Sequence, residues 1–332
     1  MRPKVFATRR IPSPGFEMIL ERCDVTVYEE EATLDRQELL TSVRETEGLV
    51  CIPGDRIDAE LLDAAPLLKV ISTCSVGYEH IDVAEATKRG IYVGYTPEVL
   101  TAATADFTLA LLTAAARRIA EGDRYVRAGK WHGRFDYMLM LGKPVWEATL
   151  GIIGFGRIGQ AVATRAGGFR MKVLYHDVRR LPAAEERRLG IEYHSFDDLL
   201  GESDFVTIHL PYSKATHHLI GERELKLMKP TAMLVNTSRG RIVDQAALVR
   251  ALELGWMAGA GLDVYEREAL EADSPLLLME NVTLSPHIGS ATWSTRSKMG
   301  ELAARNLLAA LAGGTPVYWV NPEAEKVRRA EC

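Results

Sequence analysis

The length, composition and charge of the chain limit what it can be. Its 332 residues exceed the ~150 residues of a common single domain, so we expect about two domains. With 26% charged and 47% hydrophobic residues, the composition excludes disordered and collagen-like proteins. A formal net charge of −5 argues against a nucleic-acid binder, because such proteins need clustered cations, so we expect small-molecule partners and no nucleic acid.

The cysteines and the hydropathy pattern indicate a soluble protein. The four cysteines show neither C-x-x-C pairing nor metal-ligand spacing, and we expect reduced thiols at Cys23, Cys51, Cys74 and Cys332. No stretch reaches the ~18 apolar residues of a membrane span, and the amino terminus lacks the apolar core of a signal peptide. We therefore expect a cytoplasmic protein with no membrane partner.

Short β-rich runs alternate with helical patterns along most of the chain, which predicts α/β architecture with parallel sheets. The first series of predicted strands comprises residues 5–8, 25–28, 48–52, 69–73 and 91–93. The second series comprises residues 149–153, 172–176, 205–210, 232–236, 258–264 and 282–285. Between the two series lies a helical candidate, residues 101–118, expected between domains or subunits. The segment after Pro322 has few apolar residues, and we expect it not to dock firmly.

A glycine-rich turn opens the second series. Residues 150–161 read L-G-I-I-G-F-G-R-I-G-Q-A, which sets G-x-G-x-x-G between a strand and a helix. The first glycine permits a tight turn, the second lets a pyrophosphate approach the backbone, and the third allows close helix packing. The pattern favours dinucleotide binding over a plain βα turn, through Gly154, Phe155, Gly156, Arg157, Ile158 and Gly159.

Asp177 points to the identity of the dinucleotide. It follows the next strand, about 20 residues after the glycines, where a carboxylate can accept hydrogen bonds from a ribose 2′-hydroxyl. A carboxylate there repels a 2′-phosphate, so we expect NADH to be preferred. NADPH stays possible because Arg179 or Arg180 could reach a 2′-phosphate, although both could also be solvated surface charges.

Three later strands are followed by residues that would supply an anion clamp, a carboxylate that orients a histidine, and a proton donor: Arg239, Glu268 and His287. In open α/β sheets, ligands bind beyond the carboxyl ends of the strands. Negative charge grows on the carbonyl oxygen during reduction, so Arg239 would polarise the carbonyl group and His287 would supply the proton. A carboxylate would orient the histidine, and Glu266 competes with Glu268 for that role.

Several longer motifs extend across residues 76–290. They are V-G-Y-E-H-I-D at 76–82, T-A-D at 104–106, the glycine turn, residues 228–244, G-L-D-V at 261–264 and P-H-I-G-S at 286–290. Together they resemble the D-2-hydroxyacid dehydrogenase family, most closely its glyoxylate/hydroxypyruvate reductase branch. The resemblance covers nearly the whole chain. One departure concerns the carboxylate that orients the histidine, because the family places it before a proline and here Glu268 precedes Ala269.

The resemblance implies two Rossmann-like, doubly wound parallel-sheet domains. A flavodoxin-like substrate domain would comprise residues 1–98 and 288–332. An NAD(P)-binding domain, residues 99–287, would be inserted within it and carry the dimerisation helix. The expected assembly is a homodimer in which residues 131–142 approach the partner's cleft.

The resemblance also implies roles for individual residues. Arg239 would bind the carboxylate and carbonyl of the 2-oxo acid, His287 would be the acid/base, and Glu268 would bond His287. The backbone amides of Val76 and Gly77 would hold the substrate carboxylate. From the matched motifs we assign the remaining contacts, to the substrate from Ser290 and to the cofactor from Thr104, Thr237, Ser238 and Asp263, the last facing the nicotinamide carboxamide.

The predicted function is therefore NAD(P)H-dependent reduction of a small 2-oxo acid. Glyoxylate would give glycolate, and hydroxypyruvate would give D-glycerate. Two alternatives stay open: a dehydrogenase for bulkier D-2-hydroxy acids, and an NADH-sensing binding protein of the same fold.

Overall fold

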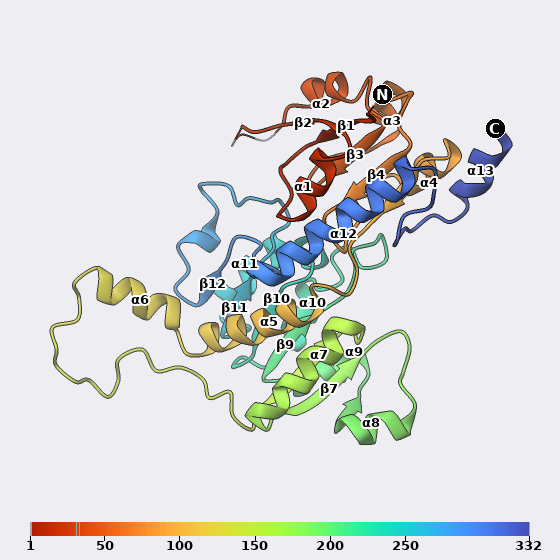
Figure 1. Cartoon of the computed structure of the whole chain (residues 1–332). Coiled ribbons are helices and arrows are strands. Elements are labelled where there is room, and N and C mark those ends of the chain that lie inside the picture. The colour runs from red at the N-terminus through yellow and green to blue at the C-terminus, as the bar shows by residue number, and fades with distance from the viewer. Residues whose placement is uncertain (1, 31, 33, 332) are drawn as a thin grey trace. The chain divides into compact units, whose positions relative to one another are not determined.

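The first and last segments of the chain fold into one unit, and the segment between them forms another. The computed structural model describes residues 2–30, 32 and 34–331 (Figure 1). Unit 1 comprises Met1–Leu100 and Ala291–Cys332, and unit 2 is the continuous segment Thr101–Ser290. Each unit contains its own parallel sheet.

Unit 1 is built on a five-stranded parallel sheet in the order β2-β1-β3-β4-β5. This is the strand order of flavodoxin-like folds. The strands are β1 (Lys4–Ala7), β2 (Asp24–Val27), β3 (Gly48–Cys51), β4 (Val70–Thr73) and β5 (Tyr92–Gly94). The helices are α1 (Gly15–Leu20), α2 (Arg36–Ser42), α3 (Ala59–Ala64), α4 (Val83–Lys88), α12 (Trp293–Leu311) and α13 (Ala324–Glu331).

The two faces of this sheet are covered by different helices. Every residue of β3 and β4 is buried, as expected for a central parallel strand. Because side chains alternate along a strand, Leu49 and Ile71 pack with residues of α2, α3 and α4. On the other face, the Ser72 hydroxyl donates to the carbonyl of Ala303 in α12, at 2.8 Å. The carboxy-terminal segment therefore completes the core that the amino-terminal segment begins.

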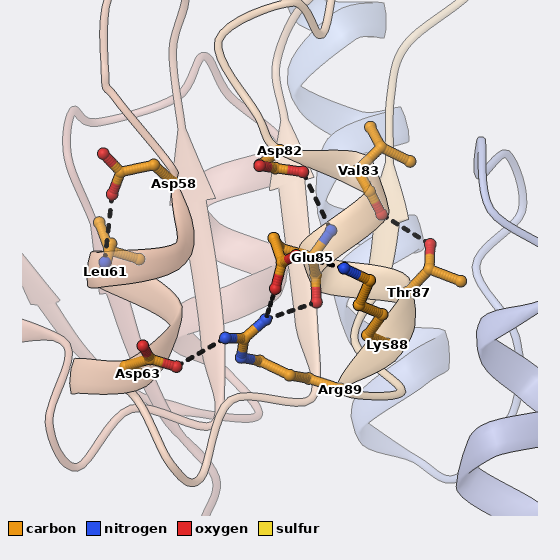
Figure 2. Close-up of polar contacts among 9 residues, drawn as sticks. All are labelled: Asp58, Leu61, Asp63, Asp82, Val83, Glu85, Thr87, Lys88 and Arg89. Carbon is orange, nitrogen blue, oxygen red and sulfur yellow. Dashed lines mark hydrogen bonds and ion pairs between the residues drawn. The ribbon is translucent and has the colours of Figure 1, made fainter.

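Helices α3 and α4 are held by side-chain caps and an ion-pair network (Figure 2). Asp58 and Asp82 accept hydrogen bonds from first-turn amides of α3 and α4, at 3.2 and 3.0 Å. Such caps satisfy amides that have no partner within the helix. Arg89 joins the two helices, since its guanidinium bonds Asp63 at 2.6 Å and Glu85 at 2.5 Å. These contacts stabilise the helical layer beside the loop that follows β4.

Unit 2 is built on a seven-stranded parallel sheet in the order β12-β11-β10-β9-β6-β7-β8. The strands are β6 (Thr149–Ile153), β7 (Lys172–His176), β8 (Ile191–Tyr193), β9 (Phe205–Ile208), β10 (Met233–Asn236), β11 (Gly259–Leu262) and β12 (Val282–Leu284). The α-helices are α5 (Thr101–Ala116), α6 (Ile119–Arg127), α7 (Arg157–Ala166), α8 (Ala183–Leu189), α9 (Phe196–Glu202), α10 (Glu222–Leu227) and α11 (Gln245–Glu253). The strand order reverses between β6 and β9, and such a switch point is where doubly wound sheets bind ligands.

The predicted fold class is confirmed: both sheets are parallel and doubly wound. The segment after Pro322 differs from the sequence-based expectation. It forms α13, where Ala324 is fully buried and the Arg328 guanidinium lies over the Tyr92 ring, 4.7 Å from its centroid. An arginine can cover apolar surface with its aliphatic stem, so docking does not require an apolar helix face.

The described residues bear on two expectations from the sequence, one about membrane spans and one about the cysteines. Within them, none of the helices is long and apolar enough to cross a membrane. Cys23, Cys51 and Cys74 are buried and free, and burial raises the pKa of the Cys51 and Cys74 thiols. Cys332 lies outside the described residues.

Candidate active site

The glycine turn lies between β6 and α7, and its three glycines have different surroundings. Gly154 has a φ of +89°, and a Cβ there would lie 2.8 Å from the carbonyl of His209. A Cβ at Gly159 would lie 2.3 Å from the carbonyl oxygen of Gly154. At Gly156, the N-cap of α7, a Cβ would have no neighbour within 4 Å among the residues that the structure describes. Protein atoms exclude side chains at two positions, and the open third position fits a pyrophosphate beside the helix amides.

Asp177 connects the glycine turn to the loop that follows β7. Its Oδ2 accepts a hydrogen bond from the amide of Phe155 at 2.7 Å, and its Oδ1 accepts from the amide of Arg179 at 3.0 Å. Each carboxylate oxygen can accept a further hydrogen bond. The carboxylate is thus held beside the glycine turn with acceptor capacity left for a ribose hydroxyl.

His287 and Glu268 are brought together at the carboxyl edge of the seven-stranded sheet. Glu268 follows β11 and His287 follows the neighbouring β12. The Nδ1 atom of His287 lies 3.2 Å from Oε2 of Glu268. Glu266 instead pairs with His218, whose Nε2 atom lies 3.0 Å from Oε1 of Glu266. The geometry therefore separates the two carboxylates that the sequence leaves as competitors.

The loop that carries His287 is anchored by Asp263, whose side chain is fully buried. Its Oδ1 accepts from the amide of Ile288 at 2.8 Å and from the hydroxyl of Ser285 at 2.6 Å. Its Oδ2 accepts from the amide of Gly289 at 2.8 Å. His287 lies between Ser285 and Ile288, which both donate to Asp263, and has a φ of +54°. Sequence reasoning assigns Asp263 to the cofactor and misses this anchoring, which joins residues more than 20 positions apart.

Arg239 lies three residues after β10, in a loop stabilised by Asn236. The Asn236 side chain donates to the carbonyl of Arg239 at 2.9 Å and accepts from the amide of Ser238 at 3.0 Å. The next residue, Gly240, approaches the loop after β11 so closely that a Cβ would lie 1.9 Å from the carbonyl oxygen of Tyr265. The close approach brings the Arg239 loop beside the segment that leads to Glu268.

The other assigned residues fall into two groups. Thr104 in α5 is buried, and Thr237 is linked to α5 through Thr108, whose hydroxyl oxygen lies 2.8 Å from that of Thr237. Ser290 follows the His287 loop, as the last residue of unit 2. In unit 1, the loop after β4 contains Val76 and Gly77, where Ser75 donates to the carbonyl of Gly77 at 2.5 Å.

A cavity of about 600 Å³ lies beside the Glu266 segment. Its wall carries charges of both signs, including Arg241, Arg267 and Glu271. The Arg241 guanidinium donates to the carbonyl of Glu266 at 3.3 Å and lies over the ring of Tyr212. The cavity thus adjoins the Glu266–His218 pair.

Comparison with a family model identifies much of unit 2. Residues 109–289 match the model described as D-isomer specific 2-hydroxyacid dehydrogenase, NAD binding domain. The match contains the glycine turn, Arg239, Glu268 and His287. The matched segment spans more than half of the chain and contains most of the candidate site.

Similar proteins extend the comparison to the full length. The chain is 52% identical to a glyoxylate reductase of Korarchaeum cryptofilum, and the alignment covers 99% of this chain and 98% of that protein. It is also 52% identical to a glyoxylate reductase of Thermococcus kodakarensis, with 99% of each covered. Among solved structures, the TT0316 protein of Thermus thermophilus has a TM-score of 0.89 at 45% identity, with 96% of this chain and 99% of that chain covered. An NADPH-dependent glyoxylate/hydroxypyruvate reductase of Sinorhizobium meliloti, in complex with NADP and malonate, has a TM-score of 0.85 at 31% identity, with 98% of each chain covered.

Proposed function

The chain belongs to the D-isomer specific 2-hydroxyacid dehydrogenase family and is an oxidoreductase, and on this premise we propose that it reduces small 2-oxo acids. The proposed reactions convert glyoxylate to glycolate and hydroxypyruvate to D-glycerate. The observation that carries the proposal is the His287 loop, which the buried Asp263 carboxylate holds at the carboxyl edge of the sheet, with Nδ1 of His287 3.2 Å from Oε2 of Glu268. The glyoxylate reductases at 52% identity support the small substrate.

A nicotinamide dinucleotide fits the residues around the glycine turn, and when bound it supplies the hydride for the carbonyl carbon. The open space at Gly156 and the amides of α7 suit its pyrophosphate. Asp177 suits the adenosine ribose of NADH, because its oxygens keep acceptor capacity while its charge opposes a 2′-phosphate. We assign the other cofactor contacts to Thr104, Thr237, Ser238 and Asp263.

Side chains of this protein stabilise the negative charge that develops on the carbonyl oxygen and supply its proton. Arg239 holds the substrate carboxylate and polarises the carbonyl, since a guanidinium presents paired donors in a plane. The Glu268 carboxylate lies 3.2 Å from Nδ1 of His287 and in the proposed role orients the ring, which leaves Nε2 for the substrate. Nε2 then donates a proton to the carbonyl oxygen as negative charge develops there.

We assign substrate binding and cofactor binding to different parts of the chain. Residues 1–98 and 288–332 form the proposed substrate domain, in which the amides of Val76 and Gly77 hold the substrate carboxylate and Ser290 contributes a hydroxyl. Residues 99–287 form the proposed cofactor domain. The parallel sheet and the glycine turn of unit 2 support a separate cofactor domain, and the two units divide at Leu100 and Ser290, so residues 288–290 lie in unit 2.

We further propose a cytoplasmic homodimer that assembles through residues of unit 2. None of the residues of α6, all of which the structure describes, is buried. The segment after α6 exposes large apolar side chains, with Tyr137 83% and Met138 73% exposed. Contiguous apolar exposure of this kind is typical of interaction surfaces. The free thiols of Cys23, Cys51 and Cys74 support a reducing compartment.

The test is a comparison of kcat/KM for glyoxylate, hydroxypyruvate, pyruvate and phenylpyruvate, each with NADH and NADPH. We expect the highest values for glyoxylate and hydroxypyruvate with NADH. Fastest turnover of phenylpyruvate would overturn the small-substrate proposal in favour of a dehydrogenase for bulkier acids. Binding of NADH without turnover of any 2-oxo acid would indicate a sensor rather than an enzyme.

A further inference from the structure

The loop after β7 contains Arg180, whose guanidinium forms an ion pair with Glu186. Nε of Arg180 lies 2.8 Å from Oε1 of Glu186, and Nη2 of Arg180 lies 3.0 Å from Oε2. Two parallel contacts of this kind form a bidentate pair, which is stronger and more directional than a single contact. The guanidinium also lies over the ring of Tyr193, 5.1 Å from its centroid. Arg180 is therefore held in one orientation by both an anion and an aromatic face.

Glu186 is itself fixed from the interior of unit 2. It lies in α8 and is only 7% exposed. Its Oε1 accepts a hydrogen bond from the hydroxyl of Tyr175 at 2.8 Å, and that hydroxyl accepts from the amide of Leu181 at 2.8 Å. Burial raises the pKa of Tyr175 to about 12, so its hydroxyl stays protonated and donates at neutral pH. The hydrogen bond from Arg180 lowers the pKa of Glu186, which keeps the carboxylate ionised.

This network lies in the same loop as the carboxylate proposed to bind the ribose. Asp177 is three residues before Arg180, and its two oxygens accept hydrogen bonds from the amide of Phe155 in the glycine turn and the amide of Arg179 in its own loop. A 2′-phosphate at Asp177 would need a nearby cation to offset the repulsion. To present the same two donors to that phosphate, Arg180 would have to leave Glu186, and a nearly buried carboxylate would lose its cation.

We propose that Glu186 is a residue that determines cofactor specificity, because it withholds Arg180 from the adenosine ribose. This inference rests on the proposed function, in which Asp177 faces that ribose. NADPH then meets two obstacles, the charge of Asp177 and the pairing of Arg180 with Glu186. Glu186 touches neither substrate nor cofactor and acts through Arg180.

The test is Glu186→Gln, measured as the ratio of kcat/KM with NADPH to kcat/KM with NADH. Glutamine keeps the size of the side chain and an acceptor for Tyr175, but it loses the charge that holds Arg180. We expect the ratio to rise about threefold to tenfold, as expected when a charge-assisted pair becomes a neutral one. The matched control is Glu185→Gln, which removes the same charge one position earlier, from an exposed pair with Arg188. The control should leave the ratio within about twofold of the wild type.

A second substitution identifies the group responsible. In the Glu186→Gln background, Arg180→Ala should abolish the gain with NADPH. A gain that persists without Arg180, or an equal gain in Glu185→Gln, would overturn the proposal. Circular dichroism and the thermal midpoint show whether each variant is folded.

Arg180→Ala alone keeps the proposal testable if Glu186→Gln does not fold. If Glu186 keeps Arg180 away from the ribose, Arg180→Ala should leave the ratio of kcat/KM with NADPH to that with NADH within about twofold of the wild type. A several-fold loss of NADPH efficiency would show that Arg180 already contacts the phosphate. Asp177→Ala separates this inference from the proposed function. A shifted ratio in Asp177→Ala with no effect of Glu186→Gln would refute the role of Glu186 alone. No shift in Asp177→Ala would refute the ribose assignment itself.

Discussion

Two carboxylate–histidine pairs lie on the loops of unit 2, and they are similar in distance, backbone conformation and exposure. Glu266 and His218 are 3.0 Å apart, and Glu268 and His287 are 3.2 Å apart. Both histidines have positive φ values, +51° and +54°. The exposed fractions of the four side chains lie between 33% and 49%. Distance, backbone conformation and exposure therefore do not distinguish the proposed catalytic pair from the other pair.

The surroundings of the two pairs differ. Nδ1 of His287 faces Glu268, and the loop on either side of this histidine is bonded to the buried carboxylate of Asp263. His218 uses Nε2 for Glu266, and its ring stacks on His217 with 3.9 Å between centroids. The comparison teaches that a held loop at the ligand-binding edge, rather than the pair itself, marks the catalytic candidate.

The strongest test of this comparison replaces each histidine. His287→Ala should lower kcat for glyoxylate by about two to four orders of magnitude, the range of a positioned acid. NADH binding, measured by fluorescence titration, should survive, because His287 is not assigned to the cofactor. The control His218→Ala removes an imidazole with the same local geometry and should keep kcat within about threefold. Equal losses in the two variants would contradict the distinction between the pairs.

The anchoring of the His287 loop is tested by Asp263→Asn. An asparagine amide presents a donor where the carboxylate accepts, so a buried backbone N–H loses its partner. We expect kcat to fall about tenfold to a hundredfold, because small displacements of a catalytic group are costly. Asp244→Asn is the control, since Asp244 accepts from a backbone amide at 2.9 Å in the cap of α11.

The same variant separates two roles for Asp263. A loss confined to kcat supports anchoring of His287. A large rise in the KM for NADH with little change in kcat would favour the nicotinamide contact alone, and it would weaken the comparison between the two histidine loops.

The two glutamates give a smaller but more direct comparison. Glu268→Gln keeps the size of the side chain but replaces the carboxylate beside Nδ1 of His287 with a neutral amide, and we expect kcat to fall about tenfold. Glu266→Gln should leave kcat within about twofold of the wild type. Steady-state rates with glyoxylate and NADH decide between them. A larger loss in Glu266→Gln would show that His218, and not His287, has the functional partner.

Local patterns made much of the fold predictable. The runs that form β6 and β10 are mostly apolar and almost entirely buried, as is typical of parallel strands. The glycine turn is also a local requirement, since protein atoms crowd Gly154 and Gly159. The edge strand β8 was missed because it has three residues with Glu192 at its centre, which is too short for a periodic pattern.

The parts of the site that escaped prediction depend on contacts distant in sequence. Glu266 and Glu268 belong to one irregular loop, where no periodicity assigns a direction to a side chain. Their separation follows from the neighbouring loops, which bring His218 to one and His287 to the other. The bond from Asp263 to the loop after β12 and the pairing of Arg180 with Glu186 have no sequence motif. Residue identities thus indicated the chemistry, and packing decided the partners.

The weakest expected effect comes from a single bond in the His287 loop. Ser285→Ala removes the hydroxyl that donates to Asp263 at 2.6 Å and leaves the two backbone amides bonded to the same carboxylate. One hydrogen bond contributes about 1 kcal/mol, so we expect kcat to fall only about twofold to fivefold. Ser203→Ala is the control, because Ser203 is a fully buried serine of the same unit whose hydroxyl donates to Leu199 at 2.6 Å. A loss in Ser285→Ala as large as that in Asp263→Asn would show that the side-chain bond, rather than the pair of backbone amides, holds the loop. Equal losses in the two serine variants would indicate a general loss of stability, and the anchored loop would no longer distinguish His287 from His218.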